Sequence, residues 1–405
     1  MRALIMDMTH GGDILAEEYT KRGYHVVCAD VYNIATEEQM DHIRSLGAEA
    51  YPLVPEGYYD LKIAPAHCPD IFADGSRWDK EMTFSEAVNQ CIDDDRFRIE
   101  ITGVKGKTSS CYILAAMLDA AGKKVFLHTS RGQGPFINGH HRIECKMSIA
   151  PTSLLRLPKG DYDVIIAECS LGGSGKADVA AITNLVEDYG IAKNTRKASD
   201  AKASILTDKV NIVLDVEKEM WSRYGNHRLI GYGGRIKILK KPRFGEVLEV
   251  SVDYDGISEI SLNGSYLSIG YIESMDLALE VCKSMNISKE AVLKALSDFK
   301  GVPGRGEIIH DNGLTVIRER NPGISHISIR RTLDCLNILD QLNERTLIIL
   351  DPVSKKVCDK MDMDQIRSVV KSFGVDMIVT AGDGVRPDIP NGKTEIIEFI
   401  KEGFQ

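Results

Sequence analysis

A strand, a glycine-rich loop and a helix follow one another between residues 98 and 122. The apolar run RIEI predicts a buried strand, and KTSSCYILAAMLDAAG predicts a helix that ends at Gly122. The loop between them has only two residues between Gly103 and Gly106, whereas the common P-loop has four before its Gly-Lys-Thr. Glycines let a backbone approach a phosphate closely, and helix N-termini bind anions. The segment therefore predicts an α/β fold with a phosphate-binding loop.

Short apolar runs alternate with helical stretches on both sides of this loop. Near the N-terminus, RALIMD, GDILAEEYTKRG and YHVVCADVY are expected to form a strand, a helix and a strand. Continuous apolar runs of this length are typical of strands that are buried on both faces of a parallel sheet. We therefore predict an α/β fold with a doubly wound parallel sheet at its centre. Its further strands are VFLH (125–128), DVIIAE (163–168), AAITNL (180–185) and VNIVLD (210–215).

The length of 405 residues predicts about three domains at roughly 150 residues each. We expect an N-terminal α/β substrate domain at 1–80, a central P-loop ATPase domain at 81–300 and a C-terminal α/β domain at 301–405. The segment 55–72 carries three prolines and is expected to be a connecting region.

The later part of the chain predicts two further patterns. From about residue 228 alternating strands indicate an antiparallel extension, and 274–298 is expected to be helical. The C-terminal domain is expected to alternate strands and helices, in the order strand LTVI, helix SIRRTLDCLNILDQL, strand TLIILD, helix MDQIRSVVKSF, strand DMIVTA and helix IIEFIKEGF.

The composition of the chain argues against a membrane or a nucleic acid as its partner. No apolar run approaches the roughly 20 residues that span a bilayer. Nine cysteines are scattered singly, which argues against a disulfide framework or a zinc knuckle and fits a reducing cytoplasm. The net charge of −9 argues against nonspecific binding to a nucleic-acid backbone. We therefore expect a cytoplasmic protein with neither a membrane nor a nucleic acid as partner. The sequence leaves the oligomeric state open.

Two stretches concentrate positive charge against this acidic average. Residues 123–146 hold eight Lys, Arg and His side chains against Glu144 alone, and 317–331 hold five against Glu319. A charge run is often only a solvated face, but the glycines and prolines here indicate loops, where binding groups tend to lie. We therefore expect a small polyanionic substrate. The candidate substrate-binding residues are His128, Arg131, His140, His141, Arg318 and Arg320.

The glycine loop also indicates a family. Gly103-Val104-Lys105-Gly106-Lys107-Thr108 resembles the G-T-N-G-K-T loop of the Mur ligase superfamily, ATP-dependent enzymes built as three α/β domains. The resemblance extends over most of the chain from about residue 80 onward. It implies ATP and Mg²⁺ as cofactors, with Lys107 on the phosphates. The implied ATP-binding residues are Gly103, Val104, Lys105, Gly106, Lys107, Thr108, Ser109, Asn184 and Arg305.

Other motifs of the superfamily can be matched one at a time. DVIIAECS resembles a strand that ends in E-x-S, which implies Glu168 as a Mg²⁺ ligand together with Thr108. ITNLVED resembles the T-N-I…D-H segment and supplies Thr183, Asn184 and Asp188. In DAKASIL, Lys202 matches a lysine that is carbamylated in many Mur ligases, although a lysine on a helix is often simply solvated. GVPGRGE resembles the G-R-x-E motif whose arginine reaches the ATP phosphates, which implies that role for Arg305.

The sequence also departs from the superfamily pattern. Lys105 replaces the loop asparagine, and Tyr189 replaces a metal-binding histidine after Asp188. Glu273 and Asp276 stand where asparagines normally contact adenine. Around the Asn-Pro-Gly at 321–323, Arg318 and Arg320 replace an acidic residue and a histidine. These changes indicate a substrate outside the cell-wall pattern.

The resemblance implies a reaction in which ATP activates a carboxylate as an acyl phosphate, ADP leaves, and a nucleophile displaces phosphate. The implied catalytic residues are Lys107, Glu168, Lys202 and Arg305. In its size and its basic stretches the chain most resembles the archaeal Mur-like ligases of nickel-tetrapyrrole biosynthesis. The resemblance implies that a ring carbon of the substrate closes on its activated propionate, and that nickel enters only as part of the substrate. A pseudomurein or other peptide amide ligase, a folylpolyglutamate-type enzyme and a non-catalytic ATP-binding switch stay open as alternatives.

Overall fold

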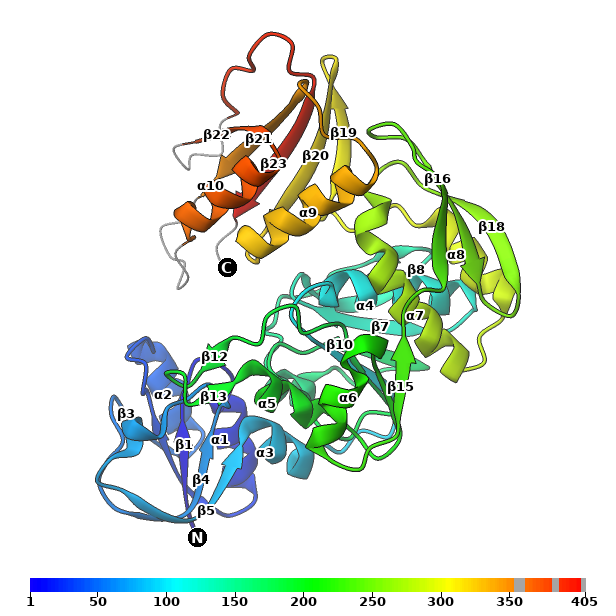
Figure 1. The fold of residues 1–405 in the computed structure, drawn as a ribbon. Helices are drawn as coiled ribbons and strands as arrows, with labels where there is room; N and C mark the ends of the chain where they lie inside the picture. The colour runs from blue at the N-terminus through cyan, green and yellow to red at the C-terminus, as the bar shows by residue number, and fades with distance from the viewer. Residues whose placement is uncertain (353–360, 381–385, 402–405) are drawn as a thin grey trace. The chain divides into compact units, whose positions relative to one another are not determined.

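The computed structural model describes residues 1–352, 361–380 and 386–401 (Figure 1). By its internal contacts the chain divides into two compact units. The first unit comprises Met1–Tyr232 and Glu280–Asn286, and the second comprises Gly233–Leu279 and Ile287–Gln405. In the described ranges no helix is both long and apolar enough to cross a membrane.

The first unit begins with a parallel sheet of five strands in the order β3-β2-β1-β4-β5, the blue part of Figure 1. The expected strand–helix–strand opening is confirmed. Its elements are β1 (Arg2–Met6), α1 (Gly12–Lys21), β2 (His25–Ala29), α2 (Glu37–Ser45), β3 (Glu49–Tyr51), β4 (Tyr58–Ala64) and β5 (Arg77–Thr83).

The prediction that 55–72 only connects other elements is wrong. Its middle forms β4, which pairs with both β1 and β5 and buries Tyr59 and Ile63 completely. A proline cannot donate to a sheet ladder, and the prolines of this segment, Pro55, Pro65 and Pro69, all lie outside the strand. They therefore mark the ends of β4.

The central sheet of the first unit has eight strands in the order β15-β14-β11-β6-β10-β7-β8-β9. The strands from β15 to β7 are parallel, which confirms the predicted parallel sheet. The strands are β6 (Phe97–Thr102), β7 (Val125–Thr129), β8 (Gly132–Ile137), β9 (His140–His141), β10 (Val164–Glu168), β11 (Val179–Ile182), β14 (Val210–Leu214) and β15 (Leu229–Tyr232). The other elements of this part of the unit include α3 (Phe84–Cys91), α4 (Lys107–Ala120), η2 (Pro151–Arg156), β12 (Gly190–Ile191), β13 (Arg196–Lys197), α5 (Ala198–Lys202) and α6 (Lys218–Trp221).

The predicted strand 125–128 is confirmed as β7, but the rest of the basic stretch 123–146, expected to be loop, contains two further strands. β7 and β8 form a tight antiparallel hairpin, and β9 pairs with β8 at the edge of the sheet. The glycines of this stretch serve close packing: a Cβ at Gly134 would come within 2.0 Å of the Arg142 carbonyl oxygen. Glycine in a strand often marks such a close backbone approach, so its presence did not require a loop.

A single hydrophobic cluster joins the two sheets of the first unit. It contains Ile5 from β1, Phe84 and Val88 from α3, Phe126 from β7 and Ile165 from β10. Burial of apolar side chains is the main favourable term in folding. The N-terminal sheet and the central sheet therefore share one core.

The second unit contains a small antiparallel sheet, β16 (Ile236–Lys240), β17 (Leu248–Asp253) and β18 (Ile257–Leu262), which confirms the predicted extension. The predicted helical stretch 274–298 is two helices, α7 (Ile272–Ser284), whose residues from Glu280 onward belong to the first unit, and α8 (Lys289–Asp298) in the second. Asn286 has a φ of 55° between them, and the Ser288 hydroxyl accepts a hydrogen bond from Ala291 N to cap α8.

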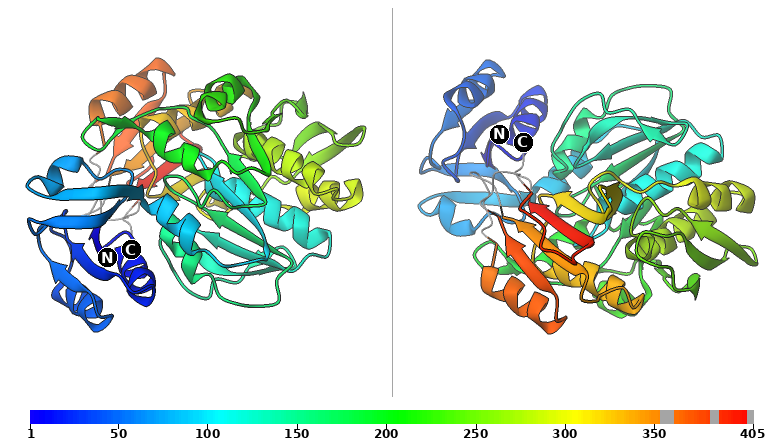
Figure 2. Two further views of the ribbon diagram at one scale, coloured as in Figure 1. Left: turned by 90° about the horizontal axis from the view of Figure 1, so that it is seen from below. Right: turned by 90° about the horizontal axis from the view of Figure 1, so that it is seen from above.

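The C-terminal sheet of the second unit has the order β19-β20-β23-β21-β22, and α9 and α10 lie side by side on one of its faces (Figure 1; Figure 2). Its elements are β19 (Glu307–Asp311), β20 (Leu314–Asn321), α9 (His326–Ile338), β21 (Thr346–Asp351), α10 (Met363–Ser372), β22 (Asp376–Val379) and β23 (Glu395–Lys401). The basic stretch 317–331 accordingly lies on β20 and α9 as well as in the turn between them.

The predicted final helix IIEFIKEGF is wrong within the described residues, because 395–401 form β23. This strand lies between β20 and β21 and is parallel to both. Six of its seven residues are buried, including Glu398. The charged residues inside IIEFIK suggested a helix with a polar face, but a central strand covered on both sides has no such face.

Candidate functional site

The glycine loop lies between the end of β6 and the start of α4. Gly103 has a φ of 135°, and a Cβ there would come within 2.0 Å of the Thr183 hydroxyl oxygen. Gly106 has a φ of 84° and is the N-cap residue of α4. Both positions lie in the region that favours glycine. The short loop is therefore a defined turn that delivers Lys107 and Thr108 to the first turn of a helix.

Asn184 fixes the loop from the neighbouring strand end. Its side-chain oxygen accepts a hydrogen bond from Lys105 N at 3.1 Å, and its side-chain nitrogen donates to the Lys105 carbonyl oxygen at 3.1 Å. Its own carbonyl oxygen accepts from Val104 N. Asn184 is fully buried. The implied ATP-binding residue therefore shapes the loop backbone in this structure.

A hydroxyl and a carboxylate meet beside the loop. Thr108 Oγ1 donates to Glu168 Oε2 at 2.9 Å, and Glu168 Oε2 also accepts from Ser130 N at 3.0 Å. Ser130 Oγ lies 3.2 Å from Thr108 Oγ1. Hydroxyl and carboxylate oxygens are ligands that suit Mg²⁺. The arrangement fits the implied metal site and adds Ser130, which no motif indicated. Ser130 follows β7, and β7 pairs with β10, the strand that ends at Glu168, so strand order is the signal that would have indicated it.

Two lysines converge on the carbonyl oxygen of Gly103. Lys107 Nζ donates to it at 3.2 Å, and Lys202 Nζ donates to it at 2.9 Å and to Ser170 O at 3.0 Å. The Lys202 side chain is buried, with 1% of its surface exposed. Burial, and secondarily the charge of Lys107, holds the Lys202 pKa well below its usual value. Lys202 is therefore more easily deprotonated than an exposed lysine.

Asp188 positions the helix that carries Lys202. Its carboxylate accepts hydrogen bonds from Ser199 N at 2.9 Å and Ser199 Oγ at 2.8 Å, in the first turn of α5. Negative charge near a helix N-terminus is stabilising. Asp188 thus fixes the start of α5 and thereby helps to position Lys202 at its end.

The four candidate substrate residues of the first unit differ in accessibility. His128 on β7 is 1% exposed, and burial lowers its pKa to about 4. His141 Nδ1 lies 2.8 Å from the Tyr112 hydroxyl oxygen, and burial lowers the His141 pKa to about 4. Arg131 is half-buried in the β7–β8 turn, and His140 is exposed. Accessibility favours Arg131 and His140 as direct contacts, while the role of all four stays a prediction.

The remaining candidates belong to the second unit. Arg305 is half-buried in a turn in which its N donates to Val302 O, and its carbonyl oxygen accepts from the Tyr271 hydroxyl at 2.6 Å. Arg318 on β20 donates to the buried Glu398 at 3.0 Å, while Arg320 on the same strand is exposed.

The two departures on α7 have distinct environments. Glu273 forms an ion pair with Arg331 at 3.4 Å. Asp276 accepts hydrogen bonds from Gly234 N at 2.7 Å and Arg235 N at 3.2 Å, and burial raises its pKa to about 6. Asp276 therefore holds main chain at the start of the small antiparallel sheet.

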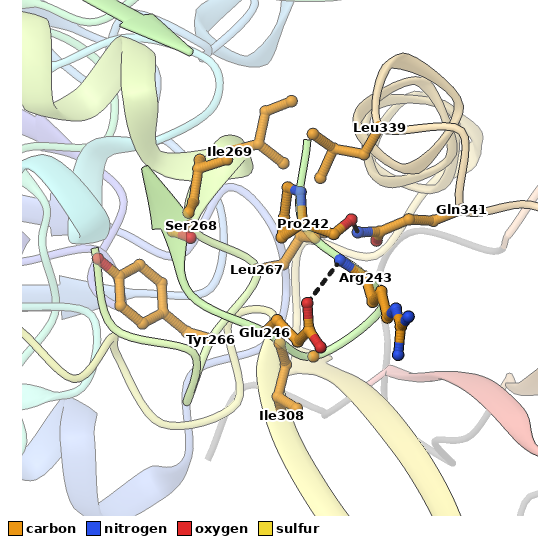
Figure 3. A pocket seen from close by; sticks show the side chains of 12 residues that line it. Pro242, Arg243, Glu246, Tyr266, Leu267, Ser268, Ile269, Ile308, Leu339 and Gln341 are labelled. Carbon is orange, nitrogen blue, oxygen red and sulfur yellow. Dashed lines mark hydrogen bonds between the residues drawn. The ribbon is translucent and has the colours of Figure 1, made fainter. Parts of the chain in front are cut away.

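The second unit also contains a shallow surface pocket (Figure 3). Gln341 donates to the Pro242 carbonyl oxygen at 2.9 Å, and Arg243 N donates to Glu246 at 3.1 Å. The lining contains none of the residues that the sequence predicts for the site. It is lined by Pro242, Arg243, Gly245, Glu246, Leu248, Tyr266, Leu267, Ser268, Ile269, Ile308, Leu339 and Gln341.

Comparison with known proteins gives relatives over nearly the whole chain. It is 27% identical to the coenzyme F(430) synthetase of Methanosarcina acetivorans, over 91% of this chain and 87% of that protein. It is also 27% identical to the coenzyme F(430) synthetase of Methanocaldococcus jannaschii, over 99% and 93% of the two chains. No protein-family profile matches the chain.

Among solved structures, the MurF ligase of Thermotoga maritima in complex with ADP aligns with a TM-score of 0.56 at 13% identity, covering 93% of this chain and 91% of that one. A likeness at this identity concerns the fold, and it confirms the predicted Mur-ligase-like α/β architecture. The resemblance to coenzyme F(430) synthetases is confirmed by the two sequence relatives. The chain is also 23% identical to the UDP-N-acetylmuramate–L-alanine ligase of Caulobacter vibrioides, over 72% of this chain and 63% of that protein, which agrees with the resemblance to Mur ligases. Together these findings support an ATP-dependent ligase.

Proposed function

We propose that this chain, like the coenzyme F(430) synthetases it resembles, uses ATP to activate a carboxylate of a nickel tetrapyrrole and then closes a carbocyclic ring. The observation that carries the ATP-dependent step is the convergence at the glycine loop. Lys107 and Lys202 share the Gly103 carbonyl oxygen, and Thr108 bonds to Glu168 on the other side. One loop thus brings together two lysine amino groups and the metal-ligating groups.

In the first step the loop amides and Lys107 would hold the ATP phosphates, and Thr108 and Glu168 would hold Mg²⁺, which supplies charge neutralisation when bound. A substrate carboxylate oxygen attacks the γ-phosphorus, the bond to the β-phosphate oxygen breaks, and ADP leaves. Catalysis of this kind consists mainly of positioning and electrostatic stabilisation. Lys107, fixed at the start of α4, would provide both.

In the second step a nucleophile attacks the acyl carbon and phosphate leaves. For ring closure the nucleophile is a carbon of the neighbouring ring, which loses a proton as the C–C bond forms. The substrate thereby loses one water in total, and ATP becomes ADP and phosphate. Support for this nucleophile comes from the name of the two relatives. The basic residues at β7–β9 suit a polycarboxylate as substrate.

An amide ligase is the second candidate, because the fold neighbour MurF is a ligase of the same architecture. It would use the same ATPase with an amine as nucleophile. The two functions differ in the mass of the product, since ring closure removes water without adding an amino acid.

The test is an ATPase assay with Mg²⁺ against polycarboxylate tetrapyrroles, muropeptides and pterin glutamates, followed by mass spectrometry. We expect ADP release with a nickel tetrapyrrole and a product lighter by one water. Incorporation of an amino acid would instead establish the amide ligase. If no substrate in the panel causes ADP release, the ATP-binding switch is favoured. Lys107→Ala is expected to bind substrate without turnover, whereas the exposed Lys123→Ala should turn over normally.

A further inference from the structure

The N-terminal sheet has a topological switch point between β1 and β4. From β1 the chain runs to β2 and β3 on one side and then returns to β4 on the other side of β1. In open parallel α/β sheets, ligands bind in the crevice beyond the carboxyl ends of the strands at such a point. Asp7 and His10 follow β1, and His67 follows β4. The three side chains therefore come from the segments that follow the two strands bordering the crevice.

These three residues also meet in space. His10 Nδ1 lies 2.5 Å from Asp7 Oδ2, and the His10 and His67 ring centroids are 5.3 Å apart. One potential ligand atom from each of Asp7, His10 and His67 lies within 4.8 Å of the other two. This is the only such group of His, Cys, Asp or Glu in the part of the chain that the structure describes.

The carboxylate of this group is rigidly held. Asp7 is fully buried and has a φ of 106°, a conformation that L residues adopt only when their surroundings impose it. Its Oδ1 accepts hydrogen bonds from Thr9 N at 2.7 Å and from Thr9 Oγ1 at 3.0 Å. A Cβ at Gly12 would come within 1.7 Å of the Asp7 carbonyl oxygen. The turn is built around Asp7: its main chain holds the strained φ, and its carboxylate is fixed by the Thr9 hydrogen bonds.

The second imidazole is held by stacking. The ring of His67 stacks on Tyr32, with centroids 5.7 Å apart and planes inclined by 20°. Among the described residues, neither nitrogen of His67 has a hydrogen-bond partner. The ring is half-buried, so one face is packed and its nitrogens remain available to a ligand.

We propose that Asp7, His10 and His67 bind a divalent transition-metal ion such as Zn²⁺, Co²⁺ or Ni²⁺. Two imidazoles and one carboxylate are a donor set for these ions, whereas Mg²⁺ takes oxygen ligands. Ligands about 2.0–2.1 Å from zinc lie roughly 3–3.5 Å apart, so small side-chain rotations close the group. The site is separate from the hydroxyl and carboxylate at the glycine loop, and it stands independently of the proposed ligase activity.

The first experiment is a titration of the full chain, freed of metal, with Co²⁺ while its visible absorption is recorded. We expect saturation at one ion per chain, and a Kd weakened by about tenfold or more in His10→Ala and in His67→Ala. The matched control is His25→Ala, because His25 also lies 2.5 Å from a carboxylate, that of Glu49, but has no second imidazole beside it. Equal Kd values for wild type and both site variants would overturn the proposal.

A second measurement uses the unaltered chain and does not depend on how the variants fold. Zinc X-ray absorption of the one-to-one complex is expected to show two imidazole rings in the metal's coordination shell. A shell of oxygens alone would overturn the proposal. Binding of a fluorescent ATP analogue serves as the check that His10→Ala and His67→Ala retain the fold of the first unit.

Discussion

Lys202 Nζ and the main-chain oxygen of Gly103 are 2.9 Å apart, so a buried amine is hydrogen-bonded directly to the phosphate loop. Because burial lowers the Lys202 pKa, the amine is held closer to its neutral form than an exposed lysine is. Only a neutral amine can react with CO₂, which gives a physical basis for the carbamylation that the family resemblance implies.

We therefore predict that Lys202→Met, which roughly keeps the volume of the side chain, lowers turnover by about a hundredfold while ATP binding changes little. Steady-state ADP release and ATP titration measure the two quantities. Lys123→Met, at an exposed position, is the control. Wild-type turnover in Lys202→Met would show that the amine only supports the loop.

Removing the charge of Glu168 is expected to weaken the binding of Mg²⁺. Glu168→Gln keeps a side-chain oxygen near Thr108 and Ser130 but removes the carboxylate. We expect the Mg²⁺ concentration for half-maximal activity to rise by about tenfold or more, since a neutral ligand binds a hard cation less strongly. Activity is measured across a Mg²⁺ series at saturating ATP. An unchanged Mg²⁺ requirement would exclude Glu168 as a ligand.

Lys105 stands at the position of an asparagine in the Mur loop that this segment resembles. Its backbone N and its carbonyl oxygen are both hydrogen-bonded to the Asn184 side chain. Lys105→Asn is expected to keep the loop and ATP binding, because those hydrogen bonds use only the main chain of residue 105. If the extra cation serves a polyanionic substrate, KM for that substrate should rise by about tenfold and KM for ATP by less than about twofold. A rise confined to the KM for ATP would assign Lys105 to the nucleotide.

Acid sensitivity is expected to depend on His128. Its folded-state pKa is lowered to about 4, so between about pH 6.5 and pH 4 the unfolded chain takes up a proton that the native chain does not. The contribution of His128 to the free energy of unfolding is fully present above about pH 6.5 and decreases as the pH falls. At 1.36 kcal/mol per pKa unit, the loss is about 3 kcal/mol at most.

His128→Leu should therefore lose less of its free energy of unfolding than wild type between pH 7 and pH 4.5. Urea unfolding at the two pH values measures the difference, and the exposed His140→Leu is the matched control. The same acid loss in wild type and His128→Leu would contradict the assignment.

The assignment of 395–401 as a strand predicts a strong effect at Ile397, which is fully buried between β20 and β21. Ile397→Ala is expected to destabilise the C-terminal sheet by about 2–5 kcal/mol, through lost burial and the cavity left behind. Ile257→Ala is the control, since Ile257 is 75% exposed. Thermal unfolding followed by circular dichroism compares them, and a small effect at Ile397 would argue for an exposed helix.

Local signals were enough to predict the strand–loop–helix at 98–122 and the parallel pairing of the central sheet, but not the order of its strands. They failed where neighbours decide the conformation. IIEFIK contains a charge pattern that suits a helix, but pairing on both sides makes it β23. The cluster of Asp7, His10 and His67 was also invisible in the sequence, because the two histidines are separated by 57 positions and only the order of β1 and β4 brings them together.

The position of β23 also has a consequence for biosynthesis. β20 and β21 are both made before β23, yet each pairs with β23 and they do not pair with each other. While the chain is being translated, each of these strands has one edge exposed until β23 has left the ribosome. Since domains fold as units during synthesis, the first unit can acquire its core while the C-terminal sheet is still incomplete. Unpaired strand edges favour aggregation, so this interval is when the nascent chain is expected to need a chaperone most.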